Sequence, residues 1–288
     1  IAPTPSGYLH HGNAFSFILT WLYARQHDGR IVLRIDDLDR ARKRAEYVED
    51  IFQSLDWLGL SYDLGPSGPE DFEANYSQLH RMSEYKSAFE HLIDGGLLFG
   101  CRCTRSEIAN TVDGLHPSDC LSRDIPLTSA DTCWRMATQP GSETWVDVND
   151  HDYNIEIHAT SRDPIVRRKD GLPAYHLASI VDDQFFGVNY IVRGVDLVPS
   201  TAIQRWLSRQ LPNTSFHRSK LLHHALVLAS DGTKLSKSAG ANSLAELRKS
   251  NDTPEILYEQ LSPYFGLAKP VRSLSELQQA WLETNHYA

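Results

Sequence analysis

A loop that leads into a helix opens the informative part of the chain: Ala2-Pro3-Thr4-Pro5-Ser6-Gly7-Tyr8-Leu9-His10-His11-Gly12-Asn13. Its Pro and Gly residues predict a loop, and apolar residues recur on a helical period over residues 14–25. Gly12 lets backbone approach a ligand, and we expect the helix N-terminus to present N–H groups to an anion. His10 and Asn13 can donate hydrogen bonds to phosphate oxygens whose charge grows during a reaction. Taken alone, the pattern is equally typical of a Pro-rich loop that caps a helix.

A second polar segment follows more than two hundred residues later: Asp231-Gly232-Thr233-Lys234-Leu235-Ser236-Lys237-Ser238-Ala239-Gly240. The ammonium groups of Lys234 and Lys237 can neutralise charge that moves onto departing pyrophosphate, and the glycines allow the loop to close. The alternative for this segment by itself is a solvated polar loop.

The periodicity between and around these segments predicts an α/β protein. A short apolar run rich in β-branched residues, Ile31–Ile35, reads as a buried strand, and strand character returns at Tyr190–Val192. In an irregular stretch from 101 to 163, alternation is weak except around 144–148 and 155–157. Helices are expected over residues 46–58, 77–94, 200–210, 243–249, 254–265 and 273–284, the last three forming a helical cap.

Composition narrows the class of protein. Of 288 residues, 41% are hydrophobic and 23% charged, as in an ordinary soluble globular protein. The net charge of −9 argues against a general nucleic-acid coat or a binder of anionic membranes. No apolar run is long enough for a membrane helix and no signal-peptide pattern opens the chain, so we expect a cytoplasmic protein without membrane contact. Because residue 1 is Ile, we expect the natural N-terminus to lie outside this numbering.

Taken together, the two polar segments resemble the paired signatures of class I aminoacyl-tRNA synthetases. The surrounding motifs are similar to the glutamyl/glutaminyl branch of that class. In that family's order, the chain has Ala2–Asn13, Arg34-Ile35-Asp36-Asp37-Leu38-Asp39, Asp170-Gly171-Leu172-Pro173-Ala174-Tyr175-His176-Leu177-Ala178, Arg193-Gly194-Val195-Asp196-Leu197 and Lys234–Ser238. The resemblance covers residues 1–240 and is specific because several motifs recur together.

Only a short segment follows Ser238, whereas glutamyl-tRNA synthetases continue into a long anticodon-binding region. The plan therefore resembles the glutamyl-queuosine tRNA(Asp) synthetases, truncated paralogues that consist of the catalytic part. This resemblance implies activation of glutamate with ATP and Mg²⁺, then transfer of glutamate to queuosine in the anticodon of tRNA(Asp). It also implies activation without tRNA, which glutamyl-tRNA synthetases require. We expect a monomer.

Three of the four cysteines lie close together in the sequence, which in a cytosolic protein is typical of a metal site. Cys101-x-Cys103 and His116-x3-Cys120 supply three thiolates and one imidazole, a sufficient set for tetrahedral Zn²⁺. The resembling group has Tyr where this chain has His116, and His is the better zinc ligand. Four protein ligands leave no open position, so such a zinc would be structural. The alternative is buried cysteines without metal.

The resemblance implies a Rossmann-type catalytic core, interrupted by a zinc-binding insertion and followed by a short helical part. We expect the first half of the core over 1–100, the zinc-bearing insertion and substrate-pocket region over 101–188, the second half with the Lys-Leu-Ser-Lys-Ser loop over 189–240, and the helical C-terminal part over 241–288.

The same resemblance implies roles for individual residues. Catalytic roles fall on His10, Asn13, Lys234 and Lys237, and ATP binding on His10, Gly12, Asn13 and Lys237. Substrate binding falls on Ala2, Thr4, Asp36, Tyr175 and Arg193. An Arg is also expected directly before Ile1. At position 36 the group has Glu for the substrate ammonium, so the shorter Asp36 leaves open whether glutamate is the amino acid used.

Three alternatives remain at this point. The chain could activate an amino acid for another acceptor, such as a carrier protein or a small amine. It could be a shortened glutamyl-tRNA synthetase that charges the 3′ end of tRNA. It could also be a catalytically silent synthetase-like binding protein, although a pure binder has no need of a pyrophosphate clamp.

Overall fold

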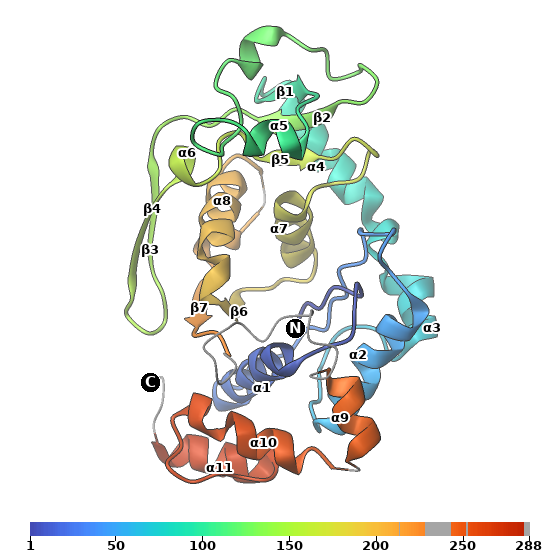
Figure 1. The fold of residues 1–288 in the computed structure, drawn as a ribbon, viewed down its shortest axis with the longest axis vertical. Coiled ribbons are helices and arrows are strands. Elements are labelled where there is room, and N and C mark those ends of the chain that lie inside the picture. The colour runs from blue at the N-terminus through green and yellow to red at the C-terminus, as the bar shows by residue number, and fades with distance from the viewer. Residues whose placement is uncertain (213, 228–242, 252, 285–288) are drawn as a thin grey trace. The chain divides into compact units, whose positions relative to one another are not determined.

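The computed structural model describes residues 1–212, 214–227, 243–251 and 253–284 of the chain (Figure 1). The predicted Lys234 and Lys237 lie outside the described residues. The chain divides into two compact units: unit 1 comprises Ile1–His80, Val192–Gly194 and His224–Ala288, and unit 2 comprises Arg81–Ile191 and Val195–His223.

Helices dominate unit 1. They are α1 (His11–Gln26), α2 (Ala45–Trp57), α3 (Pro69–Asp71), α9 (Leu244–Ser250), α10 (Glu255–Leu261) and α11 (Leu274–Thr284). Helices α10 and α11 pack against α1, and α9 packs against α2 (Figure 1). The fully buried Tyr258 donates its hydroxyl to the Leu58 carbonyl at 2.6 Å. The predicted C-terminal helices therefore complete the core of this unit.

The predicted strand Ile31–Ile35 is an extended segment of unit 1, with Ile31, Leu33 and Ile35 buried. The Leu33 N–H donates to the Leu64 carbonyl at 2.8 Å, and Val32 and Leu64 form a parallel bridge. On the other side, Asp36 N–H donates to Pro3 at 2.9 Å. Burial on both faces explains why the segment reads as a continuous apolar run rather than an alternating one.

Unit 2 contains an antiparallel sheet and a hairpin. Strands β1 (Leu98–Cys101), β2 (Cys133–Met136) and β5 (Ile165–Arg167) pair in that order, and β3 (Ser142–Val146) pairs with β4 (Asp152–Glu156). Its helices are α4 (Met82–Asp94), α5 (Arg105–Ala109), α6 (Ile157–Thr160), α7 (Tyr175–Phe185) and α8 (Val198–Ser208). Strands β6 (Tyr190–Gly194) and β7 (Lys220–His224) pair with each other.

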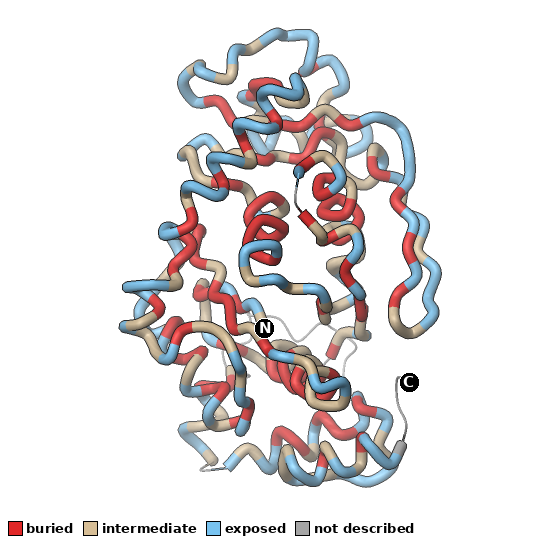
Figure 2. The backbone as a smooth tube through the Cα atoms, turned by 180° about the vertical axis from the view of Figure 1, so that it is seen from behind, coloured by how far each residue is buried: buried red, intermediate tan, exposed pale blue. Residues whose placement is uncertain are grey.

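Of the elements of this part of the chain, the sequence patterns predicted α4, α8 and β6 and found alternation around β3 and β4, but they missed β1, β2, β5, β7, α5, α6 and α7. Most of α7 is buried (Figure 2), and its buried residues include the polar Asp182 and Asp183 as well as Leu177 and Ile180. A helix buried on most sides lacks the clean amphipathic period by which helices are found. Within the described part of the chain, no helix has the length and apolar character needed to cross a membrane.

Candidate functional site

His10 is the N-cap of α1, and its side chain closes a local hydrogen-bonded ring. Its Nδ1 accepts the Gly12 N–H at 3.1 Å, while the Asn13 Oδ1 accepts the His10 N–H at 3.1 Å. Because Nδ1 is an acceptor, a neutral His10 ring carries its proton on Nε2. The Asn13 side chain uses its Oδ1 atom to accept the His10 N–H, which leaves the Nδ2 group as its hydrogen-bond donor. The side chains of His10 and Asn13, two of the predicted catalytic residues, are thus oriented by hydrogen bonds at the N-terminus of α1.

The expectation that the first amides of α1 serve an anion is wrong for three of them. The Gly12 N–H bonds to the His10 ring, and the Asn13 and Ala14 N–H groups bond to the His10 carbonyl at 2.9 and 3.1 Å. The His10 side chain thus satisfies the Gly12 donor, and the His10 carbonyl accepts from the other two amides.

The chain that follows the second polar segment returns to the first one. Leu244 donates its N–H to the Leu9 carbonyl at 2.7 Å, and Ser243 forms an antiparallel bridge with His10. Before that segment, the His224 ring packs edge-on against Phe15 with centroids 5.1 Å apart. Residues on both sides of the interval 228–242 thus contact α1 or the residues directly before it.

A buried ion pair fixes this junction. Asp50 on α2 accepts the Leu9 N–H at 2.9 Å through Oδ2 and the Arg248 guanidinium at 2.8 Å through Oδ1. Arg248 on α9 also donates to Ser54 Oγ at 2.6 Å. The Asp50 side chain is only 2% exposed, so it needs these donors to remain charged in the interior. Sequence reasoning missed this pair, because nothing local links residues 198 positions apart.

Of the predicted substrate residues, Ala2 and Thr4 are exposed in the segment that pairs with Asp36 through backbone. The Asp36 carboxylate forms a bidentate ion pair with Arg34, with distances of 2.7 and 3.1 Å. Arg193, half-buried on β6, belongs to the same unit 1. Tyr175 begins α7 in unit 2 and is 47% exposed.

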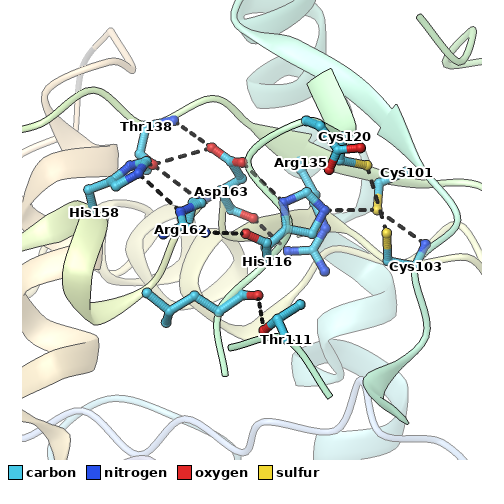
Figure 3. A network of polar contacts seen from close by, with 12 residues as sticks. Cys101, Cys103, Thr111, His116, Cys120, Arg135, Thr138, His158, Arg162 and Asp163 are labelled. Atoms are coloured by element: carbon cyan, nitrogen blue, oxygen red, sulfur yellow. Dashed lines mark hydrogen bonds and ion pairs between the residues drawn. The ribbon is translucent and has the colours of Figure 1, made fainter. Parts of the chain in front are cut away.

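The Cys/His set of unit 2 comes together in space (Figure 3). The ligand atoms of Cys101, Cys103, His116 and Cys120 all lie within 4.8 Å of one another. The Cys103 and Cys120 sulfurs are 3.8 Å apart, and Cys101 Sγ is 3.2 Å from His116 Nε2. A tetrahedral zinc with Zn–S bonds of about 2.3 Å separates its sulfurs by about 3.8 Å, so the donor set fits this metal in chemistry and spacing.

Burial and hydrogen bonds separate the pKa values of these donors. A hydrogen bond with the Cys133 thiol, and then one with His116, lowers the pKa of Cys101 to about 2. Burial raises the pKa of Cys120 to about 12. Burial lowers the pKa of His116, but hydrogen bonds with Asp163 and Cys101 outweigh it and raise the value overall.

Residues 1–272 match the family described as "tRNA synthetases class I (E and Q), catalytic domain". The chain belongs to this family. Its relatives are ligases by name, so the predicted class, an aminoacyl-tRNA synthetase-like ligase, is confirmed at the level of the family.

Two relatives of this class I synthetase chain are named "Glutamyl-Q tRNA(Asp) synthetase". The protein of Symbiobacterium thermophilum is 36% identical over 296 residues, which cover 94% of this chain and 88% of that protein. The protein of Nocardia farcinica is 36% identical over 288 residues, covering 95% and 86%. "Glutamate--tRNA ligase 2" of Syntrophus aciditrophicus is 33% identical over 302 residues, and this chain spans 60% of its length.

A solved glutamate–tRNA synthetase from Elizabethkingia anophelis has the same fold. It superposes with a TM-score of 0.66 at 23% identity, covering 83% of this chain and 52% of that one. The predicted fold class, an α/β class I synthetase catalytic core, is confirmed by this likeness together with the family match.

Proposed function

We propose that the chain activates glutamate with ATP as glutamyl-adenylate and transfers it to queuosine in the anticodon of tRNA(Asp). The observation that carries the proposal is the backbone pairing of Leu9 and His10 with Ser243 and Leu244. This pairing places Ser243 and Leu244, which follow the Lys234–Ser238 segment in the sequence, beside the His10-x-Gly12-Asn13 element. Both phosphate-handling elements therefore serve one site in our proposal.

In the first step, a carboxylate oxygen of glutamate attacks the α-phosphorus of ATP in line. The bond from that phosphorus to the bridging oxygen of pyrophosphate breaks, which gives adenylate and pyrophosphate. The donor ends of His10 and Asn13, with the ammonium groups of Lys234 and Lys237, stabilise the charge that develops on the phosphates. Mg²⁺ accompanies the triphosphate. Positioning and charge stabilisation supply the rate, so no side chain needs to take a proton here.

For the amino acid, we propose that the Asp36 carboxylate meets the substrate ammonium. Arg34 holds that carboxylate through two hydrogen bonds, which orient it although it is one methylene shorter than glutamate. We further propose that the Arg193 guanidinium binds the substrate side-chain carboxylate and that Tyr175 is a substrate-binding residue. Ala2 and Thr4 line the segment next to Asp36.

We also propose that Cys101, Cys103, His116 and Cys120 hold a structural Zn²⁺. The spacing and chemistry of the four donors support this assignment. Such a metal would cross-link β1, the loop after it and the turn at Cys120.

The choice of acceptor rests on the relatives. Two relatives named glutamyl-Q tRNA(Asp) synthetase are 36% identical to this chain, and the Syntrophus glutamate–tRNA ligase is 33% identical. We infer an anticodon nucleoside of tRNA(Asp) as the acceptor and glutamate as the amino acid.

ATP–pyrophosphate exchange tests the first step. The purified chain is assayed separately with glutamate, aspartate and glutamine, without tRNA. We expect exchange with glutamate alone, reduced at least 100-fold in His10→Ala because a donor to the developing charge is lost. His11→Ala is the matched control, since His11 contacts Gln260 on the exposed side and its exchange should stay near that of the unaltered chain.

The acceptor is then tested with tRNA(Asp) with and without queuosine. Transfer only to the modified tRNA supports the proposal. An alkali-labile ester on the 3′-terminal ribose would instead identify a tRNA-charging ligase. Exchange with another amino acid would overturn the glutamate assignment. No exchange with any of the three amino acids, persisting after tRNA is added, would favour a binding protein.

A further inference from the structure

The His116 ring is held from several sides in unit 2 (Figure 3). Its Nε2 faces the Cys101 sulfur at 3.2 Å, and its Nδ1 lies 3.0 Å from Asp163 Oδ2. Phe99 packs against the ring with centroids 5.9 Å apart. The side chain of His116 is 1% exposed and that of Asp163 is 10% exposed, so water competes little for the bond between them.

Asp163 is itself held by groups that the metal would not touch. Its Oδ1 accepts the Thr138 backbone N–H at 2.9 Å and lies 3.2 Å from Thr138 Oγ1. Its backbone carbonyl accepts from Arg135 at 2.6 Å. Arg162 donates to the His116 carbonyl at 2.9 Å, which ties the two segments together a second time. The carboxylate therefore has a defined direction before any ion binds.

We propose that Asp163 is a positioning residue that keeps the proton of His116 on Nδ1 and so presents Nε2 as a metal donor. This inference rests on the zinc site proposed above. A carboxylate can only accept at Oδ2, so the neutral ring must donate from Nδ1 and leave the Nε2 lone pair toward the cysteines. An outer partner of this kind fixes the tautomer and direction of a ligating histidine.

The substitution Asp163→Asn separates this role from simple packing. The Thr138 N–H is always a donor, so an amide at position 163 must keep its oxygen there and turn its NH₂ group toward His116. The Nδ1 atom then becomes the acceptor, and the ring proton moves to Nε2, where it blocks coordination. Asp163→Asn thus changes the size of the side chain little but favours the His116 tautomer that is protonated on Nε2 and cannot coordinate a metal through that atom.

The experiment measures binding of Co²⁺ by its visible absorption, followed by displacement with Zn²⁺ in competition with a chelator. We expect the unaltered chain to bind one ion, and Asp163→Asn to bind at least about tenfold more weakly. Its Co²⁺ spectrum should resemble that of His116→Ala rather than that of the unaltered chain. Asp113→Asn is the matched control. It removes a carboxylate from the segment that leads into His116, one that pairs with Arg162, and it should change affinity for the metal less than about threefold.

A double variant tests whether Asp163 acts through His116. In a His116→Ala background, Asp163→Asn should change affinity less than about twofold. An equal loss in both backgrounds, or unchanged affinity and spectrum in Asp163→Asn, would overturn the positioning role while leaving the metal site intact. Failure of the unaltered chain to bind Co²⁺ or Zn²⁺ would overturn both. Circular dichroism of the metal-free variants checks that each is folded.

Discussion

Replacing Arg248 by methionine breaks the ion pair that joins α9 to α2 and leaves the Asp50 carboxylate with fewer donors. The side chains are 16% and 2% exposed, and Arg248 donates to Asp50 at 2.8 Å and to Ser54 at 2.6 Å. Loss of one partner of a buried pair costs about 3–5 kcal/mol, because the other charge stays buried. Partial exposure of Arg248 lets water compensate in part, so we expect about 3 kcal/mol.

Urea unfolding followed by tryptophan fluorescence measures this loss. With a slope of about 3 kcal/mol per molar urea, the midpoint of unit 1 should fall by about 1 M. Lys249→Met is the matched control on the same helix. Its ion pair with Glu246 is 2.9 Å long but the two side chains are 71% and 51% exposed, so the midpoint should not change measurably.

Equal midpoints for Arg248→Met and Lys249→Met would refute the reasoning, because only the Arg248 pair is buried and joins α9 to α2. A second check is Asp50→Asn in the Arg248→Met background. Removing the unpaired charge should restore part of the lost stability.

Two further substitutions test other parts of the structure. Burial, and then the charge of Asp147, raises the pKa of Tyr153 to about 12, so its contribution to folding is complete below about pH 10 and is lost as the pH rises toward 12. The unfolding free energy of Tyr153→Phe should therefore fall less than that of the unaltered chain between about pH 9 and about pH 11. At Gly65, with φ +136°, a Cβ would lie 2.4 Å from the Leu33 carbonyl oxygen, so Gly65→Ala should cost about 2–4 kcal/mol in urea unfolding. Gly68→Ala, where a Cβ meets nothing within 4 Å, should stay within about 0.5 kcal/mol, and equal stability of the two variants would contradict that close approach.

Local patterns predicted most of the helices, because a helical period lies within one segment, but they did not predict the strands β1, β2, β5 and β7. The run from 14 to 25 has a helical period, and α1 spans His11–Gln26. The expected helices over 243–249 and 273–284 correspond to α9 and α11. Helix α7 was missed because buried Asp182 bonds to Arg81 and Tyr85, so polar residues occupy its core face. Periodicity cannot distinguish a satisfied buried carboxylate from an exposed one.

In the candidate sites, too, the sequence identified residues with a local spacing pattern and missed partners that are distant in the chain. The spacing of Cys101, Cys103, His116 and Cys120 was enough to select four residues whose donor atoms do lie together. No signal in the sequence pointed to Asp163, which reaches His116 from 47 residues away. The roles of His10 and Asn13 stay predictions, although the cap that orients them is local and could have been recognised from a side-chain acceptor followed by Asn three residues later.

By itself, the sequence determined the helical segments, the family through its ordered motifs and the identity of the four metal-type donors. Each of these depends on residues near one another or on a recurring pattern. Only the tertiary structure decided that Leu244 pairs with Leu9, that Arg248 neutralises Asp50 and that Asp163 directs the His116 ring. These contacts join residues far apart in the sequence, and local propensities carry no information about which distant residues will meet. They form because folding closes long loops and buries polar groups, which must then find partners in the interior.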